Sequence, residues 1–162
     1  MTEIKREMPQ ADLSDLDGFD HAILRALSTD GRMPVTELAR RIGLSKSPTQ
    51  ARLRRLEQEG YITGYAALLN PIRMGLAHVA FVEVRLSDTR EAALKAFNEA
   101  VRAIPEVEQC HMVAGGFDYL LKVRTHDMPS YRAVMGERIS ALPYLSNTST
   151  YVAMEAVKEE AF

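Results

Sequence analysis

The sequence contains a single cysteine, Cys110, and lacks long apolar segments. One cysteine cannot form an intrachain disulfide, which excludes the disulfide scaffolds of small secreted domains. No apolar run approaches the roughly 18 residues that a membrane-spanning helix needs, and the N-terminal MTEIKREMPQ has no apolar core of the signal-peptide kind. We therefore expect a cytoplasmic protein in which Cys110 is an incidental buried thiol.

The residue patterns of common enzyme sites are also missing. Cys110 and His111 are adjacent on an expected strand, so their side chains point to opposite faces and cannot act as a nucleophile and base. The segment GGFD matches neither glycine-rich phosphate-loop pattern and does not lead into a helix. The four histidines have no metal-ligand spacing; they are His21, His78, His111 and His126. We expect no catalytic residues, no cofactor and no metal.

What the sequence does contain is a local excess of positive charge. The 162 residues are 46% hydrophobic with a net charge of −2, which is typical of a soluble protein with one domain or two small ones. Between Arg40 and Arg55, however, there are six Lys or Arg residues and no Asp or Glu. A basic surface on a slightly acidic chain implies a polyanionic partner that binds at one place.

This basic segment follows two predicted helices. The first begins near Leu16, can be capped by Asp17, and ends at Asp30-Gly31. The second accepts Pro34 in its first turn, and Gly43 follows it as a residue that can adopt the positive φ of a sharp turn. A third, basic helix then completes a helix-turn-helix unit.

The third helix can be capped by Ser45 or by Ser47, which precedes Pro48, and Gly60 closes it. Its lysine and arginines suit phosphates, whereas glutamine and arginine can also bond purine edges in the major groove. A solvated basic face on an ordinary helical domain is the alternative. Residues Tyr61–Leu69 are rich in β-formers and are expected to make a small wing or linking strand.

The second half has the order β-α-β-β-α-β. Strands are expected over 76–86, 107–114, 118–125 and 146–157, and helices over 90–104 and 128–142. Gly115-Gly116-Phe117 joins the second and third of these strands as a hairpin. This order predicts a ferredoxin-like domain with an antiparallel sheet and both helices on one face, so that the whole chain is of the α+β class.

The sheet face away from the helices is expected to carry Val79, Phe81 and Leu120. Such a face is too apolar to remain wet in a stable monomer, and a homodimer that pairs two sheets covers it. A dimer also gives a helix-turn-helix protein two copies for two half-sites. The alternative is that the linking strand or the N-terminal arm folds over this face.

Three ordered motifs resemble the Lrp/AsnC family of regulators: LDGFDHAIL at 16–24, ELARRIGLSKSPTQARLRRLEQEGYITGY at 37–65, and VAGGFDYLLKV at 113–123. The resemblance implies a transcriptional regulator of amino-acid metabolism that binds double-stranded DNA and an amino-acid effector, with dimers that often assemble into octamers. The implied organisation is a flexible arm (1–15), a helix-turn-helix domain (16–60), a wing or linker (61–75), a ferredoxin-like effector and oligomerisation domain (76–158) and a tail (159–162).

The resemblance also implies two sets of site residues. The candidate DNA contacts are Ser45, Lys46, Ser47, Thr49, Gln50, Arg52, Arg54 and Arg55. The candidate effector contacts are Gly115, Gly116, Asp118, Tyr119, Thr148 and Thr150. Glycine-loop amides can donate to a carboxylate while an aspartate accepts from an ammonium. For the two threonines, ordinary packing of β-formers is an equal alternative.

Two positions depart from the family pattern. Pro34 stands where a serine commonly caps the second helix, and Gly116 replaces a residue that is often acidic or polar. The C-terminal half resembles the branch that activates proline degradation, which suggests proline as the effector. An amino-acid-binding protein without DNA affinity and an enzyme remain the alternative functions.

Overall fold

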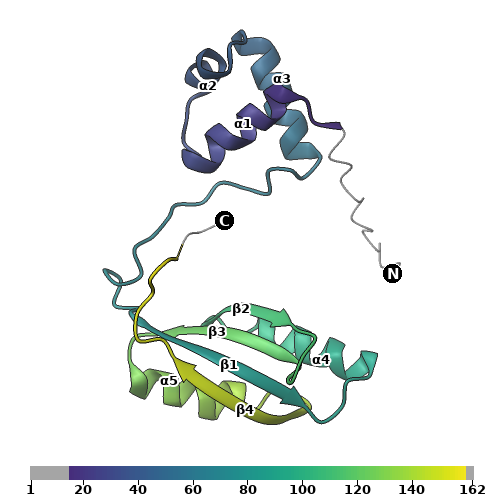
Figure 1. Cartoon of the computed structure of the whole chain (residues 1–162), viewed down its shortest axis with the longest axis vertical. Coiled ribbons are helices and arrows are strands. Elements are labelled where there is room, and N and C mark those ends of the chain that lie inside the picture. The colour runs from purple at the N-terminus through teal and green to yellow at the C-terminus, as the bar shows by residue number, and fades with distance from the viewer. Residues whose placement is uncertain (1–14, 160–162) are drawn as a thin grey trace. The chain divides into compact units, whose positions relative to one another are not determined.

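The computed structural model describes residues 15–159, which form two compact units that divide after Leu68 (Figure 1). Each unit is described by itself. The expected N-terminal arm, apart from Asp15, and the expected tail, apart from Glu159, lie outside the described residues.

The first unit consists of three helices: α1 (Gly18–Thr29), α2 (Val35–Ile42) and α3 (Lys46–Gln58). Asp17 caps α1 as predicted, because its side chain accepts from the backbone N–H groups of Phe19 and Asp20. Gly43 has φ 76°, which confirms the predicted left-handed turn between α2 and α3. The helices pack around a small core of Ile23, Ala26, Leu38 and Leu56.

Two local predictions in this unit were wrong, and a third holds only for the position of the cap. Pro34 is the N-cap of α2 rather than part of its first turn. The N-cap of α3 is Ser45, whose side chain makes no capping bond, and Ser47 already lies inside the helix. No strand forms over Tyr61–Leu69. A β-ladder needs a neighbouring strand, and no described segment of this unit runs beside these residues as one.

The second unit is the predicted ferredoxin-like arrangement, with α4 and α5 on one face of an antiparallel sheet (Figure 1). The strand order is β2-β3-β1-β4. Its elements are β1 (His78–Leu86), α4 (Glu91–Arg102), β2 (Val107–Met112), β3 (Tyr119–Thr125), α5 (Met128–Val134) and β4 (Leu145–Val152).

The core of this unit lies between the helices and the sheet. Ala80, Val82, Val84 and Leu86 alternate along β1, and all four point into this core. The predicted single helix over 128–142 is divided: α5 continues as a π-helix, η2 (Met135–Ile139), in which the Ser140 N–H donates to the Met135 carbonyl. The wider turn brings the buried Val134 and Ile139, which are five residues apart, to the same side of the segment.

The outer face of the sheet, away from α4 and α5, is more polar than predicted. Phe81 is 37% exposed, but Val79 is buried. Lys122 and Arg124 of β3 also point to this side and both pair with Glu159. The last strand ends at Val152 and does not extend to 157 as predicted. The chain after it returns to the outer face, where Glu159 lies.

Candidate functional site

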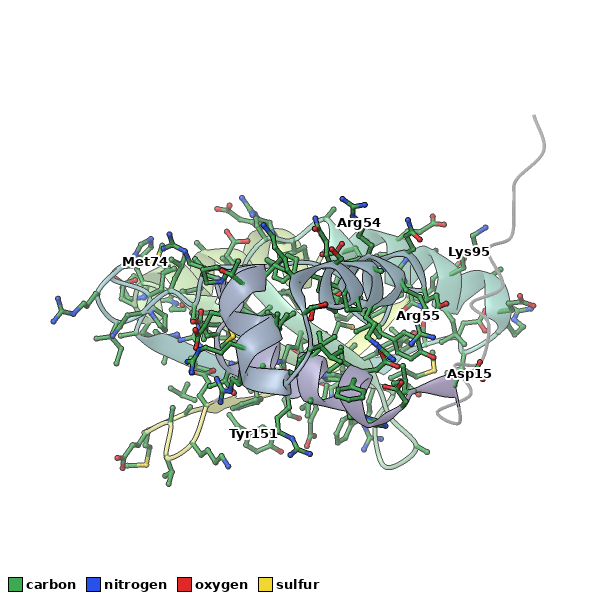
Figure 2. The ribbon with its side chains drawn as sticks, turned by 90° about the horizontal axis from the view of Figure 1, so that it is seen from above. Asp15, Arg54, Arg55, Met74, Lys95 and Tyr151 are labelled. Carbon is green, nitrogen blue, oxygen red and sulfur yellow. The ribbon has the colours of Figure 1, made fainter. Side chains whose placement is uncertain are left out.

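The exposed side of α3 carries a row of polar side chains without partners in the same unit. Ser45, Lys46, Ser47 and Arg54 are exposed, and Gln50 is half-buried. Neither Lys46 nor Arg54 forms an ion pair with a described residue. In Figure 2, Arg54 points away from the edge of α3 that carries Arg55. This surface combines cations for phosphates with an amide suited to base edges.

Thr49 does not belong to this surface. Its side chain is completely buried, and its hydroxyl donates to the Ser45 carbonyl at 2.9 Å. The resemblance had placed Thr49 among the DNA contacts. The structure supports only the packing role.

Arg52 and Arg55 are held by α1. Arg52 Nη1 lies 2.9 Å from Asp20 Oδ1, and Arg55 Nη2 lies 2.6 Å from Asp20 Oδ2. Asp20 is 1% exposed, so one buried carboxylate joins two arginines of α3 to the first turn of α1. We call Asp20, Arg52 and Arg55 the α1–α3 clip.

Asp17 strengthens this clip. Its carboxylate lies 2.7 Å from Arg52 Nη1, and the Asp20 N–H together with Arg52 holds the pKa of Asp17 below its usual value. Asp20 and then Asp17 raise the pKa of Arg52 in turn. The sequence carried a signal for the clip that was not used, because Arg52 and Arg55 are three residues apart and share a helix face.

The candidate effector residues near the hairpin gather at Asp118. Gly115 and Gly116 are exposed in the connection between β2 and β3, which the Val113 N–H closes by donating to the Asp118 carbonyl. The Asp118 N–H donates to the Val84 carbonyl, and its Oδ2 accepts from the Leu86 N–H at 2.8 Å. The second carboxylate oxygen of Asp118 has no hydrogen-bond partner among residues 15–159, so it is available for a ligand cation.

The other three candidates do not join this hairpin within one chain. Tyr119 is 1% exposed and its ring packs 4.4 Å from that of Phe97. Thr150 hydrogen-bonds the Tyr131 hydroxyl at 2.6 Å. Thr148 lies opposite Val84 and therefore on the side that faces the helices. Two strand spacings, about 10 Å, separate Thr148 from Tyr119 across β1.

A residue that the sequence reasoning missed lies beside the hairpin. A Cβ placed on Gly116 would be 3.9 Å from Arg85 Nη2 and would meet no other atom within 4 Å. Arg85 lies on the outer face of β1, and no pattern in the sequence relates it to this loop. A cation therefore lies next to the glycines that were expected to bind a carboxylate.

Two kinds of feature are absent from the part of the chain that the structure describes. Residues 15–159 contain no group of three or more His, Cys, Asp or Glu side chains placed to hold a metal ion. None of their helices is both long and apolar enough to cross a membrane. Burial raises the pKa of the Cys110 thiol and so disfavours its thiolate form.

Comparisons with known proteins agree with both units. Residues 16–63 match a winged helix-turn-helix DNA-binding family, and residues 79–161 match the Lrp/AsnC ligand binding domain. Proteins of Rhizobium radiobacter and Rhodobacter capsulatus, each named proline dehydrogenase transcriptional activator, are 64% and 62% identical over 145 residues. These matches cover 90% of this chain and 93% and 94% of the two relatives.

A solved structure extends the likeness to a liganded protein. The transcriptional regulator of Neisseria meningitidis in its L-Met complex superimposes with a TM-score of 0.83 at 32% identity. The match covers 89% of this chain and 93% of that one.

Proposed function

The chain belongs to the Lrp/AsnC family of DNA-binding transcriptional regulators, and on that basis we propose that it controls a gene of proline degradation in response to proline. Its homologues are transcriptional regulators rather than enzymes, which excludes the alternative that the protein is an enzyme. The observation that carries the proposal is the 62–64% identity, over nine tenths of the chain, to two proteins named for the proline dehydrogenase gene.

For the DNA contacts, we propose the exposed side of α3. Lys46 and Arg54 neutralise phosphates, and Gln50 reads a base edge, with Ser45 and Ser47 near the start of the helix. Arg52 and Arg55 fix the position of α3 through the α1–α3 clip. Thr49 is left out because it is buried.

For the effector site, we propose the hairpin at Gly115, Gly116 and Asp118. The free oxygen of Asp118 accepts from the effector ammonium. Tyr119, Thr148 and Thr150 support the sheet and helices behind the site. We further propose a cytoplasmic homodimer, because two recognition helices are needed for two half-sites.

The experiment is an in vitro selection of genomic DNA fragments by the purified protein, with and without L-proline. We expect enrichment of DNA upstream of a proline dehydrogenase gene and a change in its affinity when proline is added. If the enrichment responds to another amino acid and not to proline, that amino acid is the effector. Absence of any enriched DNA would favour the amino-acid-binding protein without DNA affinity.

Two variants separate the two sites in the same assay. Arg54→Ala should weaken DNA binding and reduce the slope of its salt dependence by about one for each protomer bound. Asp118→Asn should reduce the response to proline while leaving the affinity for DNA without proline unchanged. An Arg54→Ala variant with wild-type salt dependence would place the phosphate contacts elsewhere.

A further inference from the structure

The end of β1 is bound from both sides by neighbouring segments. On one side Asp118 accepts from the Leu86 N–H and donates to the Val84 carbonyl. On the other side the Ser146 hydroxyl donates to the Arg85 carbonyl at 3.0 Å. The hairpin, the end of β1 and the start of β4 thus meet at one end of the sheet (Figure 1).

Arg85 stands at an irregularity in this junction. The pairing of β1 with β4 shifts register between Arg85 and Leu86, where Ser146 is the extra residue. A bulge of this kind redirects the side chains next to it and often lies beside a binding site. Here it accompanies a guanidinium that reaches Gly116.

The guanidinium of Arg85 has no polar partner among the described residues. The side chain is exposed and forms neither an ion pair nor a hydrogen bond with another described residue. Arg124, the other arginine of the sheet, is paired with Glu108, and Arg90 in the loop after β1 is paired with Asp88. An unpaired arginine with a fixed backbone is suited to bidentate binding of a planar anion.

We propose that Arg85 binds the α-carboxylate of the effector, opposite the ammonium contact at Asp118. This inference rests on the proposed function, since it assigns a second contact to the same effector site. Arg85 and the Asp118 partner Leu86 are consecutive in β1, so one strand end sets the spacing of the positive and negative groups. The pair selects free α-amino acids over amines or amides that lack the carboxylate.

Gly116 has a defined role in this arrangement. Its backbone is outside the left-handed region, because the positive-φ glycines of the described residues are Gly43, Gly60 and Gly75. Conformational freedom is thus not what requires glycine at 116. A side chain there would project toward Arg85, and an acidic one would pair with the guanidinium and occupy it. Glycine leaves Arg85 free for the ligand.

The test is calorimetric titration of the full-length protein with L-proline and with L-prolinamide, which keeps the amine but lacks the carboxylate. L-Leucine and L-methionine, each with its amide, serve in the same way if they bind instead. The variants are Arg85→Gln, Arg85→Lys and the control Arg132→Gln, which removes an exposed arginine of α5. Thermal unfolding and DNA affinity without effector confirm that each variant is folded.

We expect Arg85→Gln to weaken binding of the acid by about tenfold or more, as loss of a charge-assisted contact does. Its affinity for the amide should not change, so discrimination between acid and amide collapses. The affinity of Arg85→Lys for the acid should lie between those of Arg85→Gln and the wild type. The affinity of Arg132→Gln should match the wild type. If Arg85→Gln still distinguishes the acid from the amide as the wild type does, the inference about Arg85 is wrong, while the proposed effector site stands. Failure of the wild type to bind any of the three amino acids would overturn the proposed effector site as well.

A second pair of variants tests the same assignment without changing Arg85. Gly116→Asp should weaken binding of the acid as strongly as Arg85→Gln, because the new carboxylate pairs with the guanidinium. Gly116→Ala adds only a methyl group at ordinary contact distance and should bind as the wild type does. Equal losses in both variants would mean that the loop backbone, not Arg85, carries the contact, and would contradict the inference.

Discussion

At the scale of single residues, neighbouring arginines of α3 have opposite roles. Arg52 and Arg55 share one helix face and bond Asp20, whereas Arg54 between them faces away from α1. From composition alone, Arg52, Arg54 and Arg55 belong to one basic patch. Only the position of the buried carboxylate separates the residues that orient the helix from those free to contact DNA.

This division predicts different effects for Asp20→Asn and Arg54→Ala. Asp20→Asn keeps the size of the side chain but removes its charge, so the helical unit should lose about 2 kcal/mol of unfolding free energy, as for hydrogen bonds to charged groups. Arg54→Ala should leave stability within about 0.5 kcal/mol while weakening DNA binding. Urea unfolding followed by circular dichroism measures the first effect, and fluorescence anisotropy with labelled DNA measures the second. An unchanged midpoint in Asp20→Asn would show that the clip adds nothing to stability.

At the scale of elements, the sequence predicted the order and type of the helices and of the sheet strands because these depend on local patterns. The strand at 76–86 and the cap at Asp17 were both predicted and are confirmed, the strand as β1. The prediction of a wing strand over Tyr61–Leu69 was wrong, because β-forming residues make a strand only where a second strand pairs with them. The site was harder still: Arg85 and Gly116 are 31 positions apart, and no periodicity relates a strand residue to a distant loop.

The turn between α2 and α3 gives a prediction at this scale. Gly43 has φ 76°, and a Cβ added there would meet nothing within 4 Å. Gly43→Ala therefore carries only the backbone cost of the left-handed conformation, about 1 kcal/mol. Gly18→Ala is a matched control, because its site is equally open and its φ is not positive. Thermal unfolding should place Gly43→Ala below both the control and the wild type; a loss shared by the two variants would assign the effect to glycine replacement in general.

At the scale of the whole molecule, the outer face of the sheet is the surface that we propose for dimerisation. Phe81 and Tyr151 lie opposite each other across β1 and β4, and both remain exposed, Tyr151 by 55%. Lys122 and Arg124 on the same face are already neutralised by Glu108 and Glu159, which lowers the electrostatic cost of bringing a second sheet against it. An exposed aromatic pair amid compensated charges is suited to an interface between two copies.

We therefore expect the wild type to be a dimer at micromolar concentration and Tyr151→Asp to be largely monomeric, because the new carboxylate would be buried against its own copy without a partner. Ala133→Asp on α5 is the control, since it adds the same charge at an exposed site on the other side of the sheet. Sedimentation velocity distinguishes the species. The monomeric variant should also bind a two-half-site operator more weakly than the control does, because each chain then contributes one recognition helix. A wild type that sediments as a monomer, or a Tyr151→Asp variant as dimeric as Ala133→Asp, would exclude the outer face as the interface.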